Sequence, residues 1–247
     1  TERMLLAQVE LGHGGQEFLT YDAVSASLDP STISRILPLE CTVPGDFSSA
    51  AFLMAVGACV PGAEVKVTGV GTNLTRIGFL DVLRWMGADT TLTEAHEEGG
   101  EPVADITVRG SELKGVTIGG DDVVRMIDEF PILAVVATQA AGRTVVRDAA
   151  ELRVKESDRI ASVVGELRKL GAAIEPRDDG FVVEGPTTLR GAEVDSLGDH
   201  RLGMALVVAG LVAQGDTIVH GAERIADSFP GFVETMRVLG ASIDDHA

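Results

Sequence analysis

An internal repeat constrains the fold of this chain more than any other feature of its sequence. Three segments share one order: an aspartate, an Ala-rich helical run, a Val-rich strand, a second helical run and a Gly-Ala pair. They begin at Asp46, Asp128 and Asp199. Self-similarity at a period of roughly 70–85 residues marks a supersecondary unit repeated around a core. The pattern by itself predicts an α/β fold with mixed sheets.

The later part of each repeat predicts where strands lie. A hairpin is expected at 90–93 with 105–109, and another at 173–175 with 181–184. The polar stretch 94–101 between the first two strands is expected to be a loop. Similar closing segments follow at 113–118 and 189–194. In the third repeat, one strand is expected after the Gly-Ala pair, where the pattern stops at Ile243 without a second hairpin strand. The Gly-Ala pairs are expected to be helix C-caps, because glycine adopts the left-handed conformation at low cost.

These boundaries suggest how the chain is organised. Residues 45–247 form the main lobe, with repeats at 45–120, 121–197 and 198–247. Residues 1–44 are interpreted as the end of a further repeat that belongs to another lobe. The chain starts at Thr1, in what reads as the middle of an element. We therefore interpret it as a fragment of a longer protein.

Composition and charge narrow the class of protein. The formal net charge of −18 argues against a nucleic-acid binder, since no basic field is available to offset phosphate repulsion. A small anionic substrate, which needs only a few local cations, remains compatible. Cys41 and Cys59 show neither metal-ligand nor redox spacing and are expected to be free thiols in a reducing compartment. Apolar runs are too short to span a bilayer, so a soluble cytoplasmic protein without a membrane partner is expected.

A charged run stands out between two apolar elements. Residues 153–159, with the sequence RVKESDR, follow a strand-like segment and precede a helical run at 160–170. Two of its cations, Lys155 and Arg159, oppose the positive end of the helix dipole. Placing cations there is favourable if the site binds an anion.

The run RVKESDR resembles a signature of the enolpyruvyl transferases, in particular of the 5-enolpyruvylshikimate-3-phosphate synthases. Residues 43–52 (VPGDFSSAAF) and 198–205 (GDHRLGMA) agree with the same family, and 227–232 (DSFPGF) agrees in part. The four matches occur in the family's order. The resemblance covers almost all of this chain but only about the C-terminal half of the family's protein.

The resemblance implies a fold and an activity. The fold is an inside-out α/β lobe of three βαβαββ units, with helices inside and mixed sheets outside. The strand missing from the third unit is expected to come from the absent N-terminal half of the same protein. The implied reaction moves the enolpyruvyl group of phosphoenolpyruvate to the 5-hydroxyl of shikimate 3-phosphate and releases phosphate. It requires neither a metal nor an organic cofactor.

Matching positions carry the family's roles onto this chain. Asp128 matches the base that accepts the hydroxyl proton, with neighbouring Glu129 as the alternative if the register is shifted by one. Glu156 matches a carboxylate that handles protons at the reacting carbon. The resemblance also assigns substrate-binding residues: Lys155, Arg159, His200 and Arg201. We expect Lys155 to lie next to Asp128 and keep it ionised.

Two positions depart from the family pattern, and alternatives stay open. Glu151 stands where some members carry a substrate-binding Asn, and Asp227 where some carry a cation that binds phosphoenolpyruvate. The aspartates that begin the repeats can be ordinary N-caps, or they can mark helix N-termini that converge on an anion site. A UDP-N-acetylglucosamine enolpyruvyl transferase is a second reading, and a non-catalytic binding or assembly domain is a third.

Overall fold

The computed structural model describes residues 42–244 and four short strands that precede them. Strands β1 (Val9–Leu11) and β4 (Ile33–Ile36) pair antiparallel, as do β2 (Leu19–Tyr21) and β3 (Ala26–Leu28). Cys41 falls outside the described residues, and Cys59 is a free thiol. The assignment of residues 1–44 to another lobe stays a prediction.

Three helices form the centre of the main lobe. Helices α2 (Phe47–Cys59), α5 (Phe130–Gln139) and α7 (His200–Val212) each begin one repeat and pack against one another. Almost all residues of α2 and α5 and about half of those of α7 are buried, which explains why α2 and α5 are apolar on every side rather than along one stripe. One aromatic pair ties the first repeat to the third: the rings of Phe52 and Phe232 meet edge-on with their centroids 6.2 Å apart. The predicted inside position of the helices is confirmed.

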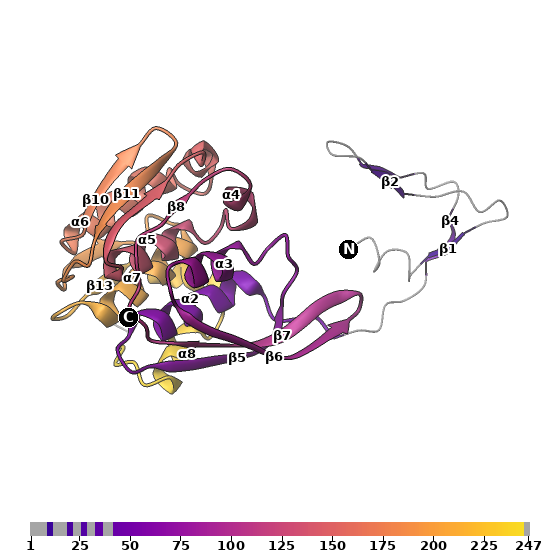
Figure 1. Cartoon of the computed structure of the whole chain (residues 1–247), viewed down its shortest axis with the longest axis horizontal. Helices are drawn as coiled ribbons and strands as arrows, with labels where there is room; N and C mark the ends of the chain where they lie inside the picture. The colour runs from indigo at the N-terminus through magenta and orange to yellow at the C-terminus, as the bar shows by residue number, and fades with distance from the viewer. Residues whose placement is uncertain (1–8, 12–18, 22–25, 29–32, 37–41, 245–247) are drawn as a thin grey trace.

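Sheets cover these helices on the outside (Figure 1). The first sheet has the order β5 (Glu64–Gly71), β7 (Glu101–Arg109), β6 (Asp89–Glu98). The second has the order β10 (Ala173–Arg177), β11 (Gly180–Gly185), β9 (Gly142–Val146), β8 (Thr117–Ile118). The third consists of β12 (Glu193–Asp195) and β13 (Ile218–His220). Both predicted hairpins are therefore present.

The first and second repeats each contribute one strand to the sheet of the repeat that follows. Strand β8, at the end of the first repeat, pairs parallel with β9 of the second, and β12 pairs parallel with β13 in the same way. An isolated parallel bridge between Gly45 and Val70 takes this place in the first sheet. This exchange gives the mixed sheets that the repeat pattern predicted, and it ties the three units into one lobe.

Further helices complete the lobe. They are α3 (Gly78–Trp85), α4 (Asp121–Arg125), α6 (Arg159–Lys169), α8 (Phe232–Val238) and the 3-10 helices η2 (Ala150–Val154) and η3 (Ala222–Asp227). The glycines of the three Gly-Ala pairs have φ values of 96°, 87° and 97° at Gly87, Gly171 and Gly240. These left-handed conformations confirm the predicted C-caps.

Two sequence-based expectations about strands fail. The loop expected at 94–101 is instead the end of a long hairpin, in which β6 runs to Glu98 and β7 starts at Glu101. The polar side chains are compatible with a strand because this ribbon is largely solvent-exposed. After α8, the described residues up to 244 form no strand, although one was expected around Ile243.

Candidate active site at three helix N-termini

The N-termini of the three central helices meet at one end of the lobe. Ser48 in the first turn of α2 donates a hydrogen bond through Oγ to Glu129, the N-cap residue of α5. Arg201, in the first turn of α7, places Nη2 3.4 Å from Oδ2 of Asp128. The predicted convergence of these helices is therefore observed. Converging helix N-termini favour negative charge, which suits a site for an anion.

The three repeat-starting aspartates have different roles. Asp46 and Asp199 are N-caps, since their carboxylates accept from the backbone N–H of Ser49 at 2.7 Å and of Arg201 at 2.9 Å. Asp128 lies one residue before the N-cap of α5, and its carboxylate makes no cap hydrogen bond. It contacts guanidinium groups instead. The reading of Asp128 as the residue that begins its helix is therefore wrong.

Arg159 lies at the centre of the cluster and is only 1% exposed. Its Nε donates to Oδ2 of Asp199 at 2.8 Å, its Nη1 lies 3.3 Å from Oδ1 of Asp128, and its Nη2 lies 2.6 Å from Oε2 of Glu156. Burial by itself would lower the pKa of Arg159, but these carboxylates, Asp199 foremost, raise it. A buried guanidinium persists only when its charge and donors are matched in this way.

The buried partner Asp199 connects the cation to the helix behind it. Its Oδ2 accepts from Arg159, while its Oδ1 caps α7. Burial raises the pKa of Asp199, but the hydrogen bond and the charge of Arg159, together with the backbone N–H groups of Arg201 and Leu202, outweigh burial and hold the pKa below its usual range. The carboxylate is thus ionised, and it fixes Arg159 relative to the first turn of α7, which carries Arg201.

A second set of polar contacts involves Oδ2 of Asp128, whereas Arg159 contacts Oδ1. Nη2 of Arg76 lies 3.7 Å from Oδ2 of Asp128 and donates to Oγ of Ser48 at 3.2 Å. The buried Glu129 accepts from the same serine. Burial raises the pKa of Glu129 to about 7, although Ser48, Arg201 and Arg76 act in the opposite direction. Three guanidinium groups therefore face Asp128.

The structure brings four predicted site residues into one cluster: Asp128, Glu156, Arg159 and Arg201. The expectation that Lys155 lies next to Asp128 and keeps it ionised is wrong. The Nζ of Lys155 pairs with Oε1 of Glu151 at 2.9 Å, and the cations that contact Asp128 are arginines. His200 is the first residue of α7 and is partly exposed beside Arg201.

Sequence reasoning missed Arg76 altogether and treated Ser48, Glu129 and Asp199 as motif, register or cap residues. A signal for Arg76 exists in the repeat. It directly precedes Ile77 and the second helical run of the first repeat, as Arg159 directly precedes Ile160 in the second. Aligning the repeats residue by residue points to this arginine, because pseudo-equivalent positions project to the same end of the lobe.

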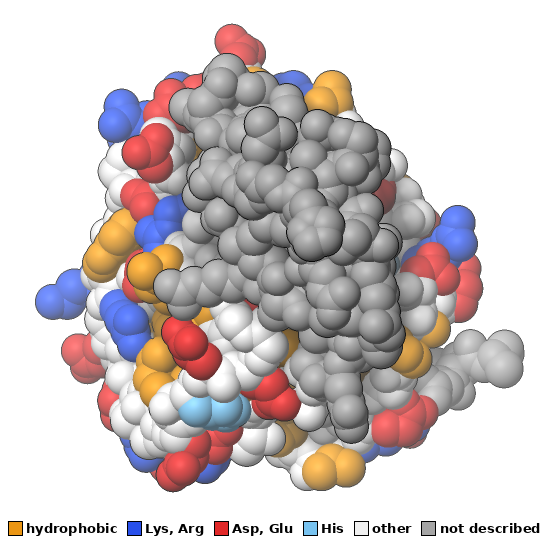
Figure 2. All heavy atoms as spheres, turned by 90° about the vertical axis from the view of Figure 1, so that its right-hand side faces the viewer, with side chains coloured by type: hydrophobic (Ala, Val, Ile, Leu, Met, Phe, Trp, Pro, Cys, Tyr) orange, Lys and Arg blue, Asp and Glu red, His pale blue; other side chains and the backbone are white. Residues whose placement is uncertain are grey.

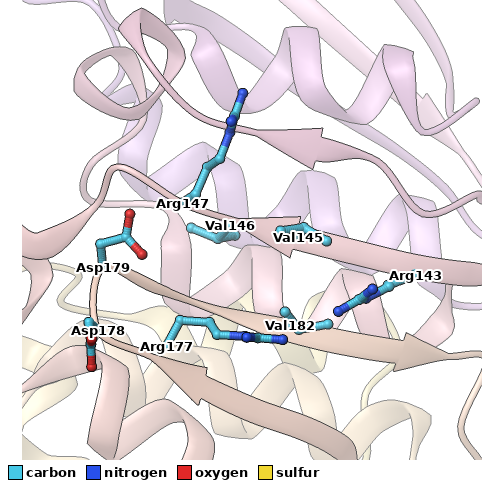
Figure 3. Close-up of a pocket in the computed structure, with 8 residues that line it drawn as sticks. All are labelled: Arg143, Val145, Val146, Arg147, Arg177, Asp178, Asp179 and Val182. Carbon is cyan, nitrogen blue, oxygen red and sulfur yellow. The ribbon is translucent and has the colours of Figure 1, made fainter.

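A shallow hollow lies elsewhere, on the outer face of the second sheet. It has a volume of about 410 Å³ and is lined by residues of β9, β10 and β11, among them Arg143, Val182 and Arg177 (Figure 3). The buried guanidinium cluster starts from the helix N-termini, so this hollow is not part of it. On the face shown in Figure 2, acidic and basic side chains are interspersed where the described residues are visible.

The described residues show no candidate metal site and no candidate membrane-spanning helix. Across residues 42–244 and the four early strands, no group of three or more His, Cys, Asp or Glu side chains is placed to hold a metal ion. In the same part of the chain, no helix is long and apolar enough to cross a bilayer.

Comparison with known proteins decides the family. A sequence profile described as EPSP synthase (3-phosphoshikimate 1-carboxyvinyltransferase) matches residues 26–236. The chain belongs to this family. A 3-phosphoshikimate 1-carboxyvinyltransferase from Brevibacillus brevis is 52% identical over 232 residues, which are 94% of this chain and 52% of the relative. One from Roseiflexus castenholzii is 48% identical over 238 residues, which are 96% of this chain and 54% of the relative. The chain spans about half the length of the curated relatives it matches.

Solved structures agree on the fold. An EPSP synthase from Acinetobacter baumannii superimposes with a TM-score of 0.87 at 40% identity, over 97% of this chain and 54% of that protein. The enolpyruvyl transferase NikO from Streptomyces tendae superimposes with a TM-score of 0.69 at 18% identity, over 91% of this chain and 50% of that protein, which supports the fold alone. The predicted fold class and the recognised family are both confirmed.

Proposed function

We propose that this chain carries one wall of the active site of a 3-phosphoshikimate 1-carboxyvinyltransferase. The reaction transfers the enolpyruvyl group of phosphoenolpyruvate to the 5-hydroxyl of shikimate 3-phosphate and releases phosphate. One observation carries the proposal: Asp128 lies against the guanidinium groups of Arg159, Arg201 and Arg76, with Glu156 on the far side of Arg159. Cations and paired carboxylates in one cluster are what an anionic substrate with moving protons requires.

The two carboxylates divide the proton transfers. Asp128 accepts the proton of the 5-hydroxyl group of shikimate 3-phosphate while the oxygen of that hydroxyl group attacks C2 of phosphoenolpyruvate. Glu156 delivers a proton to C3 of phosphoenolpyruvate. Elimination then reverses the second transfer: Glu156 takes a proton back from C3, the C2–O bond to phosphate breaks, and the phosphate leaves with the proton that Asp128 had accepted. Atoms and protons balance over the cycle, and no cofactor takes part.

The arginines bind the anionic groups of the substrates. A guanidinium matches a carboxylate or phosphate in a fork, which an ammonium cannot do. Glu156 is the most exposed of the three carboxylates around Arg159, at 46% against 22% for Asp128 and 0% for Asp199. A substrate anion therefore displaces Glu156 from Arg159 most easily. The released carboxylate takes up a proton from solvent, which it can then deliver to C3 and recover in the elimination. Lys155 is assigned to shikimate 3-phosphate, and His200 is assigned to the lining of the same pocket beside Arg201.

The partner that completes the site is the first half of the same type of protein. Because the chain spans about half of its relatives, we expect it to turn over negligibly when assayed alone. The reaction uses small phosphorylated metabolites, so we place the protein in the cytoplasm. A UDP-N-acetylglucosamine enolpyruvyl transferase is disfavoured by the family match, and a non-catalytic domain has no need of both Asp128 and Glu156.

The test combines calorimetric titration with phosphoenolpyruvate and then shikimate 3-phosphate, which measures binding, with an assay of the phosphate released from the two substrates. The chain is measured alone and mixed with a polypeptide that covers the first half of the Brevibacillus brevis relative. We expect phosphate release only in the mixture, and its loss with Asp128→Asn. Phosphate release that is unchanged by Asp128→Asn contradicts the assignment of the base.

A further inference from the structure

Glu129 is a buried carboxyl group that the proposed reaction does not use. It is 2% exposed and occupies the N-cap position of α5, yet its side chain does not cap that helix. Its Oε1 accepts the Oγ hydrogen of Ser48, at the start of α2. An ionisable group this deeply buried is costly unless it is paired or can change its protonation state.

Glu129 is linked to Asp128 through two other elements of the fold. A serine hydroxyl has one proton, and here it goes to Glu129, so that the Oγ lone pairs face Nη2 of Arg76 at 3.2 Å. The same Nη2 lies 3.7 Å from Oδ2 of Asp128. A path of polar contacts thus runs from the carboxyl group of Glu129 through Ser48 on α2 and Arg76 in the turn before α3 to the carboxylate of Asp128. The path ends at a guanidinium that is half exposed and able to meet a ligand.

Charged groups face Glu129 from every side of this junction. Asp128 is its neighbour on its own segment, Arg76 comes from the turn before α3, and Arg201 comes from α7, where His200 is the adjacent titratable residue. Burial raises the pKa of Glu129 to about 7, Asp128 adds to that, and Ser48, Arg201 and Arg76 counteract it. The carboxyl group therefore changes charge close to neutral pH, beside two of the site's cations.

We propose that Glu129 is a positioning residue that couples one proton to the anion affinity of this site, an inference that rests on the proposed function. When Glu129 is ionised, it holds Ser48 and Arg76 in place but cancels part of the positive charge of Arg76 and Arg201. When it is protonated, the site is more positive by one charge and binds a dianion more tightly. By linkage, a bound dianion raises the proton affinity of Glu129, so binding takes up a proton from solvent.

The test uses sulfate, which stays a dianion between about pH 6 and about pH 8.5, whereas phosphoenolpyruvate itself titrates. The chain is titrated calorimetrically at both pH values, in buffers of different ionisation enthalpy so that proton uptake is counted. All measurements use a His200→Gln background, because an imidazole titrates in the same range. We expect sulfate to bind about fivefold more tightly at the lower pH, with proton uptake, because one unit of charge is added near the ligand.

Matched variants isolate Glu129. With Glu129→Gln, affinity is expected to stay at the tighter value at both pH values and proton uptake to disappear. Glu184→Gln removes a carboxylate on the second sheet and is expected to behave as the parent. Ser48→Ala keeps every charge, so it is expected to retain the pH dependence while binding about threefold more weakly, since Arg76 loses its anchor. Circular dichroism and thermal unfolding establish that each variant folds.

A parent affinity that is equal at the two pH values overturns the proposal, and so does a Glu129→Gln variant that keeps the parent's pH dependence. Arg201→Ala separates this failure from failure of the proposed function. If Arg201→Ala abolishes sulfate binding but Glu129→Gln leaves the affinity and its pH dependence as in the parent, this inference alone is overturned. If sulfate does not bind, or binds regardless of Arg201→Ala, this inference is overturned, and the phosphate-release assay of the mixed halves decides the proposed function separately. If Glu129→Gln does not fold, carbon-13 NMR of the Glu129 carboxyl decides instead: an unchanged pKa on adding sulfate overturns the coupling.

Discussion

Arg159 and Asp199 form a fully buried ion pair that joins the first turn of α6 to the first turn of α7, with Nε 2.8 Å from Oδ2. The two residues are 40 positions apart in the chain and belong to different repeats. The pair therefore fixes the second repeat against the third at the point where the candidate active site forms. Its loss affects folding and ligand binding together.

Removing the carboxylate of Asp199 leaves a buried guanidinium with one charge partner fewer. We expect Asp199→Ala to lower the free energy of unfolding by about 3–5 kcal/mol, since breaking one side of a buried pair strands the other charge and here also removes an N-cap. Urea unfolding measures this loss. The control is Asp158→Ala, which removes the cap of α6 and a partly exposed pair with Arg153, and should cost about 1 kcal/mol. Equal losses in the two variants contradict a special role for Asp199.

Replacing Arg159 by lysine keeps the charge but not the three directed contacts. An ammonium cannot reach Asp199, Asp128 and Glu156 together, so Arg159→Lys is expected to weaken phosphoenolpyruvate binding by at least about tenfold. Calorimetric titration of the mixed halves provides the measurement. Arg168→Lys, on the outer part of α6, is the matched change and should leave the affinity as in the parent. An unaltered affinity in Arg159→Lys contradicts the fork geometry.

Arg76 was identified only from the structure, and its contribution is separable from that of Arg159. We expect Arg76→Ala to weaken the binding of anionic substrate about tenfold with little loss of stability, because half of this side chain is exposed. The control Arg84→Ala removes another partly exposed arginine, on α3, whose partners are Asp81 and Thr90. If the two variants bind substrate equally well, Arg76 is not part of the site.

The pH dependence of stability gives a test of Glu129 that needs no ligand. Its pKa rises from 4.5 to about 7 on folding, so the folded state binds the proton more tightly than the unfolded state. The ionised form therefore costs stability, a cost that is small at low pH and fully present above about pH 7. A shift of this size corresponds to at most about 3 kcal/mol. We expect Glu129→Gln to be more stable than the parent at about pH 8, and the difference to shrink as the pH falls toward about 5. A difference that is constant with pH contradicts the burial argument.

Much of the fold could be predicted because the same order of helices and strands recurs in three segments of the sequence. Apolar runs after Asp46, Asp128 and Asp199 predicted the central helices, and the Gly-Ala pairs predicted the C-caps of α3, α6 and α8. The extent of β6 and β7 was underestimated, because polar residues such as Glu97 and Glu98 suit an exposed ribbon as well as a loop. Local composition cannot distinguish these two cases.

The site was predictable only as far as its motifs reached. The motifs RVKESDR and GDHR pointed to Arg159 and Arg201, and in the structure both arginines contact Asp128. The burial of Arg159 and the pairing of Lys155 with Glu151 depend on contacts between repeats, and no local pattern determines them. The path from Glu129 through Ser48 to Arg76 joins three segments that are far apart in the chain.

The most direct test of the proposed function is phosphate release from phosphoenolpyruvate and shikimate 3-phosphate, with this chain and the first half of the Brevibacillus brevis relative mixed. Separate spectra establish that both polypeptides fold. The account predicts turnover only in the mixture, reduced by about 10²–10⁴ with Asp128→Asn while phosphoenolpyruvate still binds. Turnover by this chain alone, or a folded mixture in which Asp128→Asn releases phosphate as fast as the parent, contradicts it.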